Sequence, residues 1–314
     1  MGKEVAGITI NRYCASGLEA IALAVGKIKA GFGEIFIAGG TESMSMIPMT
    51  GYKLAPSYKA NIENINYHIS MGHTAEAVAK KFNIGREAAD KFSFESHKKA
   101  GEAIDSGLFK NQIVPISVNE IFVENGLRKT STKIVDTDEG VRRDTTLDGL
   151  AKLNPVFKKG GVITAGNASQ TSDGAAFVLV VSESIIKEYN LNPIARLVSC
   201  AVGGVDPLYM GIGPCIAIPK ALNKAGLKLD NIDLIELNEA FAAQALAVIQ
   251  EARLDPKKVN VNGGAIALGH PLGCTGAKLS IQLIEEMKNR NQRYGMVTAC
   301  VGGGQGISGI FECL

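Results

Sequence analysis

Two cysteines in this chain stand where thiol chemistry could take place. Cys14 follows a β-branched run at residues 7–10 and precedes a segment with helical periodicity, whereas Cys300 ends an apolar run and opens a turn that begins at Gly302. The N–H groups and dipole of a helix N-terminus stabilise a thiolate, so we expect Cys14 to have a lowered pKa and to act as a nucleophile. Glycine N–H groups beside Cys300 could form an oxyanion hole. The plainer alternative for either residue is a buried, inert thiol.

One histidine has a sequence context that favours catalysis. His270 lies in the glycine-rich segment 262–276, where a backbone without side chains can approach a ligand closely and direct the imidazole. We expect this segment to be an exposed turn ahead of a helix. The plainer alternative is that His270, beside Pro271, simply caps this turn. The other histidines occur in polar sequence and are expected to be solvated: His68, His73 and His97.

Asn238 follows a strand predicted at residues 233–236 and is either part of the site or the N-cap of the next helix. Two thiols and one imidazole together indicate covalent acyl transfer, in which one thiol is acylated and the second moves a proton. A Cys-His-Asn hydrolase uses a single thiol and would leave Cys300 without a role. The remaining cysteines are expected to be packing residues: Cys200, Cys215, Cys274 and Cys313.

These residues must be positioned by strands and helices that alternate along the chain, which is typical of an α/β protein. The hydrophobic pattern predicts strands at residues 7–10, 35–38, 175–181, 195–201, 233–236, 259–261, 294–298 and 307–312. It predicts helices at residues 18–28, 75–82, 86–106, 216–225, 239–252 and 277–287.

Two halves are expected, at residues 1–190 and 191–314, with a loop domain at about 45–160 inserted in the first. The order strand, small-residue turn, helix, strand and glycine pair occurs at the start of the chain and again from residue 259, so one unit occurs twice. Residues 194–258 precede the turn in the second copy, and almost nothing precedes it in the first. We therefore expect the first half to be N-terminally truncated.

Composition excludes several classes of function. Hydrophobic residues make up 46% of the 314 residues, so the chain can bury a core and is not globally disordered. A net charge of +2 gives no electrostatic attraction to nucleic acid or to an anionic membrane. No apolar run reaches the ~18 residues that a membrane span needs. The scattered cysteines form no C-x-x-C pair and no signal peptide is recognisable, so we expect free thiols, no zinc and a cytoplasmic protein.

Seven motifs, in order along essentially the whole chain, resemble those of the thiolase family. They are residues 11–18 (NRYCASGL), 39–45 (GGTESMS), 71–76 (MGHTAE), 165–169 (AGNAS), 238–242 (NEAFA), 269–273 (GHPLG) and 300–304 (CVGGG). The resemblance implies the thiolase fold, with two βαβαβαββ halves packed in five layers, α-β-α-β-α, and a loop domain inserted in the first half.

The resemblance also implies a role for each candidate residue. Cys14 would be the acylated nucleophile, His270 the base that activates it, and Cys300 the acid/base for the methyl group of acetyl-CoA. Asn238 would hold a water in one oxyanion hole together with His270. The N–H groups of Cys14 and Gly302 would form the other. Contacts to coenzyme A or to its acyl-pantetheine end are implied for three residues: Ser169, Arg142 and Met71.

Within the family, the sequence is most similar to the degradative 3-ketoacyl-CoA thiolases, which cleave 3-ketoacyl-CoA with coenzyme A in fatty-acid β-oxidation. This similarity rests on Gln170-Thr171-Ser172 and on residues 46–49. An acetoacetyl-CoA thiolase, which condenses two acetyl-CoA molecules, is the close alternative. Ketoacyl synthases share the fold but use a second histidine where this chain has Cys300. A thiolase-fold lipid carrier or interaction module would normally have lost the cysteine or the histidine.

The resemblance implies that no metal or redox cofactor is needed. Coenzyme A takes part as a substrate and not as a cofactor. It implies a homodimer or homotetramer, and association with a β-oxidation partner enzyme is a further expectation. The segment that family members usually carry ahead of the nucleophile motif is not found before Cys14. We therefore expect a poorly stable, aggregation-prone chain, and an inactive thiolase-fold fragment is the remaining alternative.

Overall fold

The computed structural model describes residues 2–53 and 55–314. Four strands of the second half form one mixed sheet in the order β5-β8-β7-β6. They are β5 (Ala195–Gly204), β6 (Leu234–Leu237), β7 (Tyr294–Val301) and β8 (Gln305–Cys313). The β6 strand runs parallel to β7, and β8 runs antiparallel to both of its neighbours. All of β6 and all but the first residue of β7 are buried, because helices cover both faces of this sheet.

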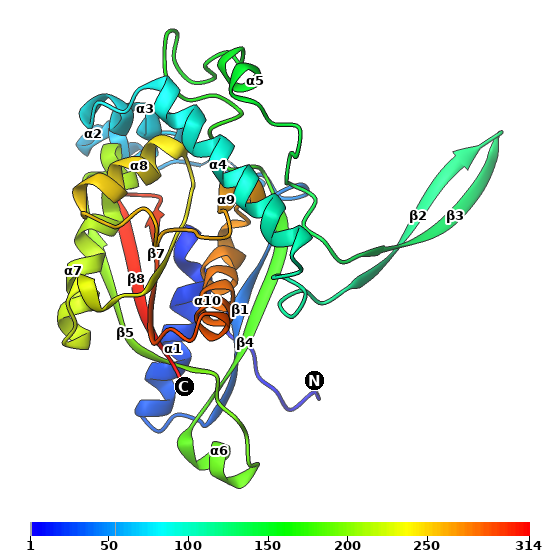
Figure 1. Cartoon of the computed structure of the whole chain (residues 1–314), viewed down its shortest axis with the longest axis vertical. Helices are drawn as coiled ribbons and strands as arrows, with labels where there is room; N and C mark the ends of the chain where they lie inside the picture. Colours follow the sequence, from blue (N-terminus) through cyan, green and yellow to red (C-terminus); the bar gives the residue numbers. More distant parts are fainter. Residues whose placement is uncertain (1, 54) are drawn as a thin grey trace.

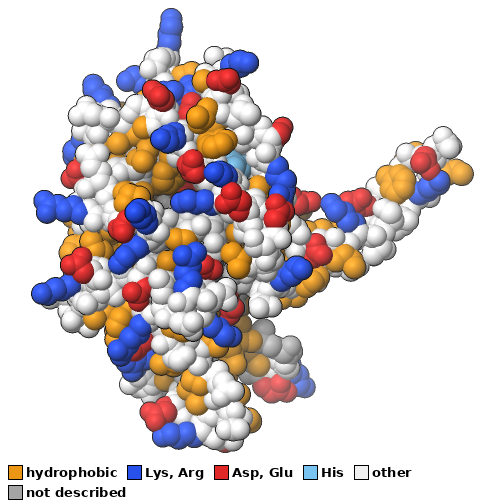
Figure 2. Space-filling model, in the orientation of Figure 1, with side chains coloured by type: hydrophobic (Ala, Val, Ile, Leu, Met, Phe, Trp, Pro, Cys, Tyr) orange, Lys and Arg blue, Asp and Glu red, His pale blue; other side chains and the backbone are white. Residues whose placement is uncertain are grey.

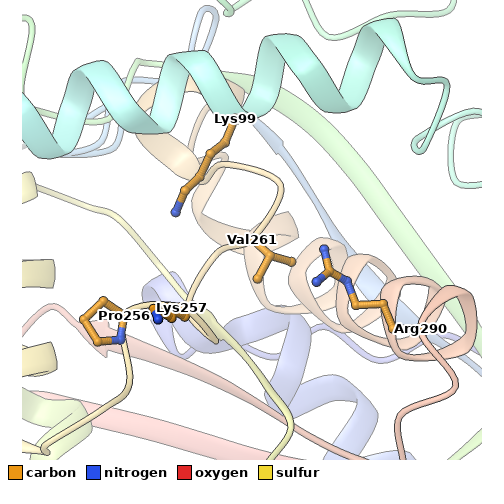
Figure 3. Close-up of a pocket in the computed structure, with 5 residues that line it drawn as sticks. All are labelled: Lys99, Pro256, Lys257, Val261 and Arg290. Atoms are coloured by element: carbon orange, nitrogen blue, oxygen red, sulfur yellow. The ribbon is translucent and has the colours of Figure 1, made fainter.

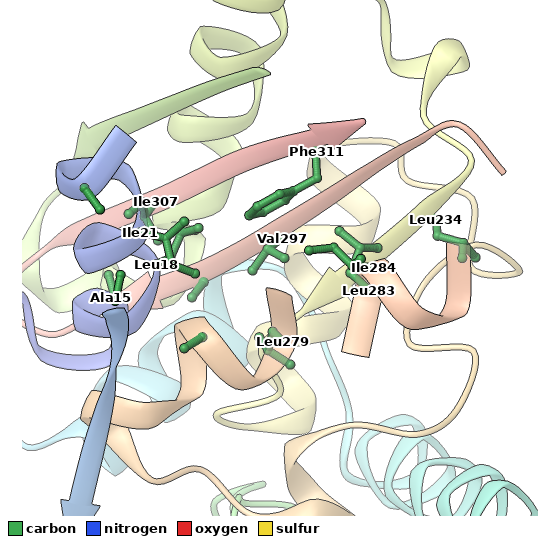
Figure 4. Packing of buried hydrophobic residues seen from close by; sticks show 14 of the residues in the cluster. Ala15, Leu18, Ile21, Leu234, Leu279, Leu283, Ile284, Val297, Ile307 and Phe311 are labelled. Carbon is green, nitrogen blue, oxygen red and sulfur yellow. The ribbon is translucent and has the colours of Figure 1, made fainter. Parts of the chain in front are cut away.

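Two pairs of helices cover this sheet (Figure 1). On one face lie α7 (Gly213–Ala225) and α8 (Ala242–Glu251), and on the other α1 (Ser16–Lys29) and α10 (Leu272–Asn289). The α1 and α10 helices approach so closely that a Cβ added to Gly17 would lie 2.5 Å from the backbone nitrogen of Ala277. Figure 4 shows side chains of α1, α10 and the sheet meeting in one apolar core, among them Leu18, Leu283 and Phe311.

On the far side of α1 and α10 lies an antiparallel ribbon of β1 (Ile35–Ser43) and β4 (Asp173–Val181). Its inner face belongs to the same core, to which Phe36, Val178 and Val180 contribute. Its outer face is apolar and open to solvent. Four apolar side chains on it are more than half exposed: Ile35 at 52%, Ile37 at 53%, Phe177 at 52% and Leu179 at 59%. The described residues therefore form the layers α-β-α-β, and none of them covers the ribbon with a fifth layer.

Residues 7–10 do not form the strand that their β-branched sequence predicts. In the second half, Val259 makes a parallel bridge to Ile235 of β6. The ribbon of the first half has no equivalent of β6 among the described residues, so residues 7–10 find no backbone partner. Ile8 is accordingly 71% exposed. The predicted strand at residues 259–261 is likewise reduced to that single bridge.

The chain between β1 and β4 carries the inserted elements: α2 (Tyr58–Glu63), α3 (Met71–Lys81), α4 (Arg86–Asp105), β2 (Ile116–Glu124), β3 (Leu127–Val135) and α5 (Leu147–Ala151). The sequence predicts α3 and α4 but only turns where β2 and β3 pair as a long hairpin. The hairpin projects from the body of the molecule, and all of its residues except Val135 are exposed (Figure 1). Without a buried face, it leaves no clear alternation in the sequence.

Short elements complete the chain: η1 (Tyr13–Ala15), η2 (Ile65–His68), α6 (Glu183–Glu188), η3 (Pro207–Ile212), η4 (Leu229–Asn231) and α9 (Ala265–Leu268). Lys, Arg, Asp and Glu side chains intermix over the face shown in Figure 2, in agreement with the small net charge. Throughout residues 2–53 and 55–314, no helix is both long enough and apolar enough to cross a membrane.

Candidate active site

Cys14 lies in the tight turn η1, directly before α1. The Oδ1 atom of Asn11 accepts the N–H of Tyr13 at 2.7 Å, and Tyr13 adopts a φ of 46°, a left-handed conformation that is uncommon for a non-glycine residue. Ser16 Oγ accepts the N–H of Arg12 at 2.9 Å and donates to the carbonyl of Tyr13 at 2.7 Å. These local bonds hold the strained backbone and place the thiol at the N-terminus of α1.

The turn between β7 and β8 brings Cys300 and Gly302 to Cys14. The N–H of Gly302 is directed at the sulfur of Cys14, and the two thiols are close enough for Cys14 to raise the pKa of Cys300. Gln305 fastens this turn to the nucleophile segment. Its Nε2 donates to the carbonyl of Gly302 at 3.4 Å, and its Oε1 accepts from Arg12 Nη1 at 2.9 Å.

Burial makes both thiols weak acids. It raises the pKa of Cys14 to about 11, although the N–H groups of Gly302 and of Cys14 itself act in the opposite direction. Burial, reinforced by Cys14, also holds the pKa of Cys300 far above its ordinary value. The lowered pKa predicted for Cys14 from its sequence position is therefore wrong, because lost hydration outweighs the helix N-terminus. The thiol of Cys14 is therefore protonated at neutral pH, and it could act as a nucleophile only with a base to take its proton.

Asn238 lies between β6 and α8 and is fully buried. Its backbone N–H donates to the carbonyl of Thr298 at 2.9 Å, which ties it to β7. The α8 helix has Phe241 as its N-cap, so the alternative prediction of Asn238 as that N-cap is wrong. Nδ2 of Asn238 lies 3.2 Å from Nε2 of His270. The buried Oδ1 of Asn238 has no hydrogen-bond partner among the described residues.

His270 is only 5% exposed, so the exposed turn predicted for it is wrong. The backbone N–H of His270 donates to Ser172 Oγ at 3.3 Å, and the ring Nδ1 lies 2.6 Å from Thr275 Oγ1. Thr275 in turn donates to the carbonyl of Pro271 at 2.9 Å. Burial, followed by the positive charge of Lys278, lowers the pKa of His270 to about 4. The imidazole is therefore neutral near physiological pH and has a nitrogen free to accept a proton.

Glu42 joins the nucleophile segment to the histidine segment. Its Oε2 accepts the N–H of Gly273 at 3.0 Å, in the first turn of α10, where a carboxylate is electrostatically favoured. Burial is the main cause of the raised pKa of Cys14 and of Cys274, and the negative charge of Glu42 adds to it at both thiols. The η1 turn also contacts both β7 and α10. Five candidate residues thus converge where β6 and β7 end and α1 and α10 begin: Cys14, Asn238, His270, Cys300 and Gly302.

Two of the three residues expected to contact coenzyme A lie beside this cluster. Met71 is the first residue of α3, and its sulfur lies 3.6 Å from where a Cβ on Gly302 would be. The N–H of Ser169 donates to the carbonyl of Ala240 at 3.0 Å, in the loop between β6 and α8. Both residues therefore border the turns that carry the thiols and the asparagine.

Arg142, the third of these residues, is exposed, and the hydrogen bonds it makes run to His97 and Thr145 rather than to the five clustered residues. The backbone N–H of Arg142 donates at 3.1 Å to Nδ1 of His97. His97 is buried, so the solvated state predicted for it is wrong. Burial and then Arg142 lower the pKa of His97, which keeps Nδ1 an acceptor. Gln170 also holds the loop that contains Gly140 and Arg142: its Nε2 donates to the carbonyl of Gly140 at 2.8 Å and to that of Ala267 at 3.3 Å.

A pocket of about 420 Å³ lies apart from this cluster and is lined by Lys99, Pro256, Lys257, Val261 and Arg290 (Figure 3). Two of the positively charged residues that line the pocket interact with buried carboxylates. Arg290 pairs with Glu286, and Lys99 lies near enough to Glu236 to act against the burial that raises the pKa of that carboxyl to about 8. In the part of the chain that the structure describes, no group of three or more His, Cys, Asp or Glu side chains could hold a metal ion.

The buried His270 should make folding stability depend on pH. Its pKa of about 4 in the folded chain lies below the ordinary 6.5, so between these values the unfolded chain binds a proton that the folded chain does not. The contribution of His270 to stability therefore decreases as the pH falls below about 6.5, by about 2 kcal/mol between about pH 7.5 and about pH 5. Glu236, with a pKa raised to about 8, adds stability over the same interval, and His97 acts in the direction of His270, but both act equally in a His270→Gln chain. Urea unfolding at both pH values should therefore show that the wild type loses about 2 kcal/mol relative to His270→Gln, and equal pH dependence of the two chains would contradict the prediction.

Several positioning contacts are not predicted by the sequence. The carboxylate of Glu239 accepts from Ser96 Oγ at 2.6 Å, from Asn260 Nδ2 at 2.8 Å and from the N–H of Ile266 at 3.2 Å. It thereby joins the loop after β6 to the segment that leads into His270. A glutamate inside one of the seven motifs is a visible signal, but its partners lie in α4 and in residues 260–266, far from it in the sequence, and leave no local pattern.

Comparison with known proteins gives matches along nearly the whole chain. Residues 1–184 match the family model for the N-terminal domain of thiolase, and residues 191–313 match that for the C-terminal domain. The chain is 52% identical to a 3-ketoacyl-CoA thiolase of Bacillus subtilis (strain 168), over 98% of this chain and 79% of that protein. It is 43% identical to an acetyl-CoA acetyltransferase of Escherichia coli (strain K12), over 100% of this chain and 81% of that protein.

Solved structures show the same likeness in three dimensions. The crystal structure of human mitochondrial 3-ketoacyl-CoA thiolase matches with a TM-score of 0.88 and 42% identity. The match covers 100% of this chain and 80% of the human one.

Proposed function

This chain belongs to the thiolase family, and on that basis we propose that it catalyses the cleavage of a 3-ketoacyl-CoA by coenzyme A. The observation that carries the proposal is that η1 packs against β7 and places the buried thiol of Cys14 beside that of Cys300, with the N–H of Gly302 directed at Cys14. A second thiol at this position provides a proton donor for a carbanion, which simple thioester hydrolysis does not need.

In the first step, the sulfur of Cys14 attacks the 3-keto carbon of the substrate. Nε2 of His270 takes the thiol proton as the C–S bond forms, because the resting thiol is neutral and the imidazole can accept. The carbonyl oxygen becomes an oxyanion, which needs donors placed beforehand. The N–H groups of Cys14 and Gly302 supply one such site, and Asn238 with a bound water and His270 supplies the other.

In the second step, the bond between C2 and C3 breaks. Its electron pair reforms the C3 carbonyl as a thioester to Cys14 and leaves acetyl-CoA as an enolate. The thiol of Cys300 protonates the enolate carbon and becomes a thiolate. The high pKa that burial gives this thiol keeps it protonated until a strong base such as the enolate forms beside it.

In the third step, the Cys300 thiolate takes the proton from the thiol of free coenzyme A. The resulting sulfur attacks the acyl-enzyme, releases a shortened acyl-CoA, and returns the Cys14 sulfur to its thiol form with the proton held on His270. Met71 and Ser169 border the site and would contact the acyl-pantetheine arm, whereas the exposed Arg142 would meet the distal, anionic part of coenzyme A.

Degradative cleavage is favoured over condensation by the relatives. Those named 3-ketoacyl-CoA thiolase are 42% to 52% identical and those named acetyl-CoA acetyltransferase 43% to 45%, so the support comes from the Bacillus subtilis protein at 52%. The acetoacetyl-CoA thiolase activity is therefore the second candidate. We propose a role in fatty-acid β-oxidation on the same ground.

We further propose that the enzyme uses no metal or redox cofactor, because every proton and acyl transfer above has a side chain or coenzyme A to carry it out. A cytoplasmic homodimer or homotetramer, in contact with a β-oxidation partner enzyme, is the assembly we propose. Six free cysteines suit a reducing compartment, and the exposed hairpin and ribbon offer surfaces for association.

The proposal is tested by supplying 3-ketoacyl-CoA and coenzyme A and identifying the products by mass spectrometry. Acetyl-CoA and an acyl-CoA shortened by one acetyl unit are expected. Comparing kcat/KM for acetoacetyl-CoA and for longer homologues then separates the two candidates. A strict preference for acetoacetyl-CoA would assign the second activity, and a folded chain that forms no acetyl-CoA from any substrate would contradict both.

A further inference from the structure

The imidazole of His270 has one hydrogen-bonding partner at each ring nitrogen. Nδ2 of Asn238 lies 3.2 Å from Nε2, and Oγ1 of Thr275 lies 2.6 Å from Nδ1. An amide nitrogen can only donate, whereas a hydroxyl has one hydrogen and two lone pairs. What Thr275 offers to the imidazole therefore depends on where its single hydrogen points.

That hydrogen has an acceptor elsewhere. Oγ1 of Thr275 lies 2.9 Å from the carbonyl oxygen of Pro271, four residues earlier, in the geometry by which helical hydroxyls commonly bond the preceding turn. A threonine that donates to Pro271 presents only a lone pair to Nδ1, so Nδ1 carries the hydrogen of the neutral imidazole. A neutral imidazole has a single N–H, and Nε2 is thus free to accept.

The same contact matters more once the imidazole takes up a proton. His270 is 5% exposed, and an imidazolium has two N–H groups that both need acceptors. Thr275 supplies the acceptor at Nδ1, and an unmet donor in so buried a site is strongly unfavourable. Nδ2 of Asn238 cannot accept from Nε2, so the acceptor there is the substrate oxyanion that the proposed mechanism places beside His270. The proton can therefore be received at Nε2 without leaving a buried N–H unpaired on the opposite side of the ring.

We propose that Thr275 is a positioning residue, which holds His270 in the Nδ1–H form and stabilises its protonated state. The inference rests on the proposed function, because it takes His270 as the base for Cys14. Neither ligand nor substrate contact is assigned to Thr275, which acts only through the imidazole.

The first test reads the tautomer without any substrate. The chain has only four histidines, so ¹⁵N-histidine labelling and comparison with His270→Gln assign the His270 signals by NMR. We expect the wild type to carry its hydrogen on Nδ1. Thr275→Val removes the acceptor with little change in shape, and the hydrogen should move to Nε2 in a substantial fraction of molecules. Thr275→Ser should keep the wild-type signals.

The second test measures kinetics. Thr275→Val should lower kcat by about 10- to 100-fold with little change in KM, because the lost bond serves a charged state reached only during the reaction. Thr275→Ser should restore most of kcat. Ser280→Ala is the matched control: Ser280 is buried on the same helix and donates to the carbonyl of Gly276 at 2.8 Å, but it does not touch His270.

A wild-type imidazole with its hydrogen on Nε2 would overturn the inference. So would Thr275→Val with an unchanged tautomer and unchanged kcat, or Ser280→Ala with the same loss of kcat as Thr275→Val. If the wild type cleaves no 3-ketoacyl-CoA but its His270 signals move in Thr275→Val and not in Thr275→Ser, the proposed function fails and the positioning role of Thr275 stands.

Discussion

Cys14→Ser should reduce the rate of 3-ketoacyl-CoA cleavage by at least about 10⁴-fold, because the covalent route depends on a sulfur nucleophile. A serine hydroxyl at this position is far less acidic than the thiol, whose pKa is already raised to about 11. The imidazole of His270, with a pKa of about 4, is too weak a base to compensate. Loss of the nucleophile leaves only substrate binding and the oxyanion donors to assist any residual reaction.

The measurement pairs rates with the site of acylation. Wild-type protein incubated with an acyl-CoA and then digested should carry the acyl group on the peptide that contains Cys14, and Cys14→Ser should carry none. Cys215→Ser is the matched control, since Cys215 is a half-buried thiol on α7 that packs against the outer face of the sheet. An acyl group on Cys300, or normal turnover by a well-folded Cys14→Ser protein, would contradict the assignment.

Much of the second half could be predicted from sequence because its strands are buried on both faces. The apolar runs that become β7 and β8 and the periodicity that becomes α10 are local signals, and the structure places all three close to the predicted positions. Boundaries are less well predicted. The α10 helix begins at Leu272 and α8 at Ala242, because glycines and buried polar residues at their starts obscure the pattern.

The first half shows where local signals fail. Residues 7–10 have the composition of a strand, but a strand needs a backbone partner, and none of the described residues supplies one. The β2-β3 hairpin is the opposite case, since it pairs along its whole length without burying a face that would make its sequence alternate. Partner availability is a property of the fold and is not encoded in these segments.

The candidate site divides in the same way. Motifs identify Cys14, His270 and Cys300 as candidates, but burial determines their acid–base state, and the sequence predicts it wrongly for Cys14. Contacts made at long range, such as that between Gln305 and Arg12, position the thiols and have no counterpart in any local pattern. A sequence supplies the types of residue that react, and packing sets how they react.

The two pKa values in the site constrain the order of events. Burial raises the pKa of the Cys14 thiol to about 11 and lowers that of the His270 imidazole to about 4, which disfavours a thiolate–imidazolium pair in the resting protein. We therefore expect proton transfer to accompany formation of the C–S bond, when negative charge moves from sulfur to the substrate oxygen. The oxyanion donors are what make that charge movement favourable.

His270→Ala should consequently reduce kcat by about 10²- to 10⁴-fold, the range typical of a lost general base, because no other group is placed to take the thiol proton as the C–S bond forms. The same substitution removes the partner of Asn238 Nδ2, so one oxyanion site is weakened along with the base. Acylation of Cys14 should slow in proportion to turnover, which a rapid-quench measurement of the acyl-enzyme can establish.

Folding must be controlled separately, because His270 is buried and its truncation leaves a cavity. Urea unfolding of His270→Ala shows whether the protein assayed is native, and His68→Ala, which truncates an exposed histidine in η2, controls for loss of an imidazole elsewhere. Added imidazole that fills the cavity should restore part of the rate if the lost function is proton transfer. A native His270→Ala protein that keeps more than about a tenth of the wild-type rate would show that proton transfer to His270 does not limit acylation, and the thiol proton of Cys14 would then have to leave by another route.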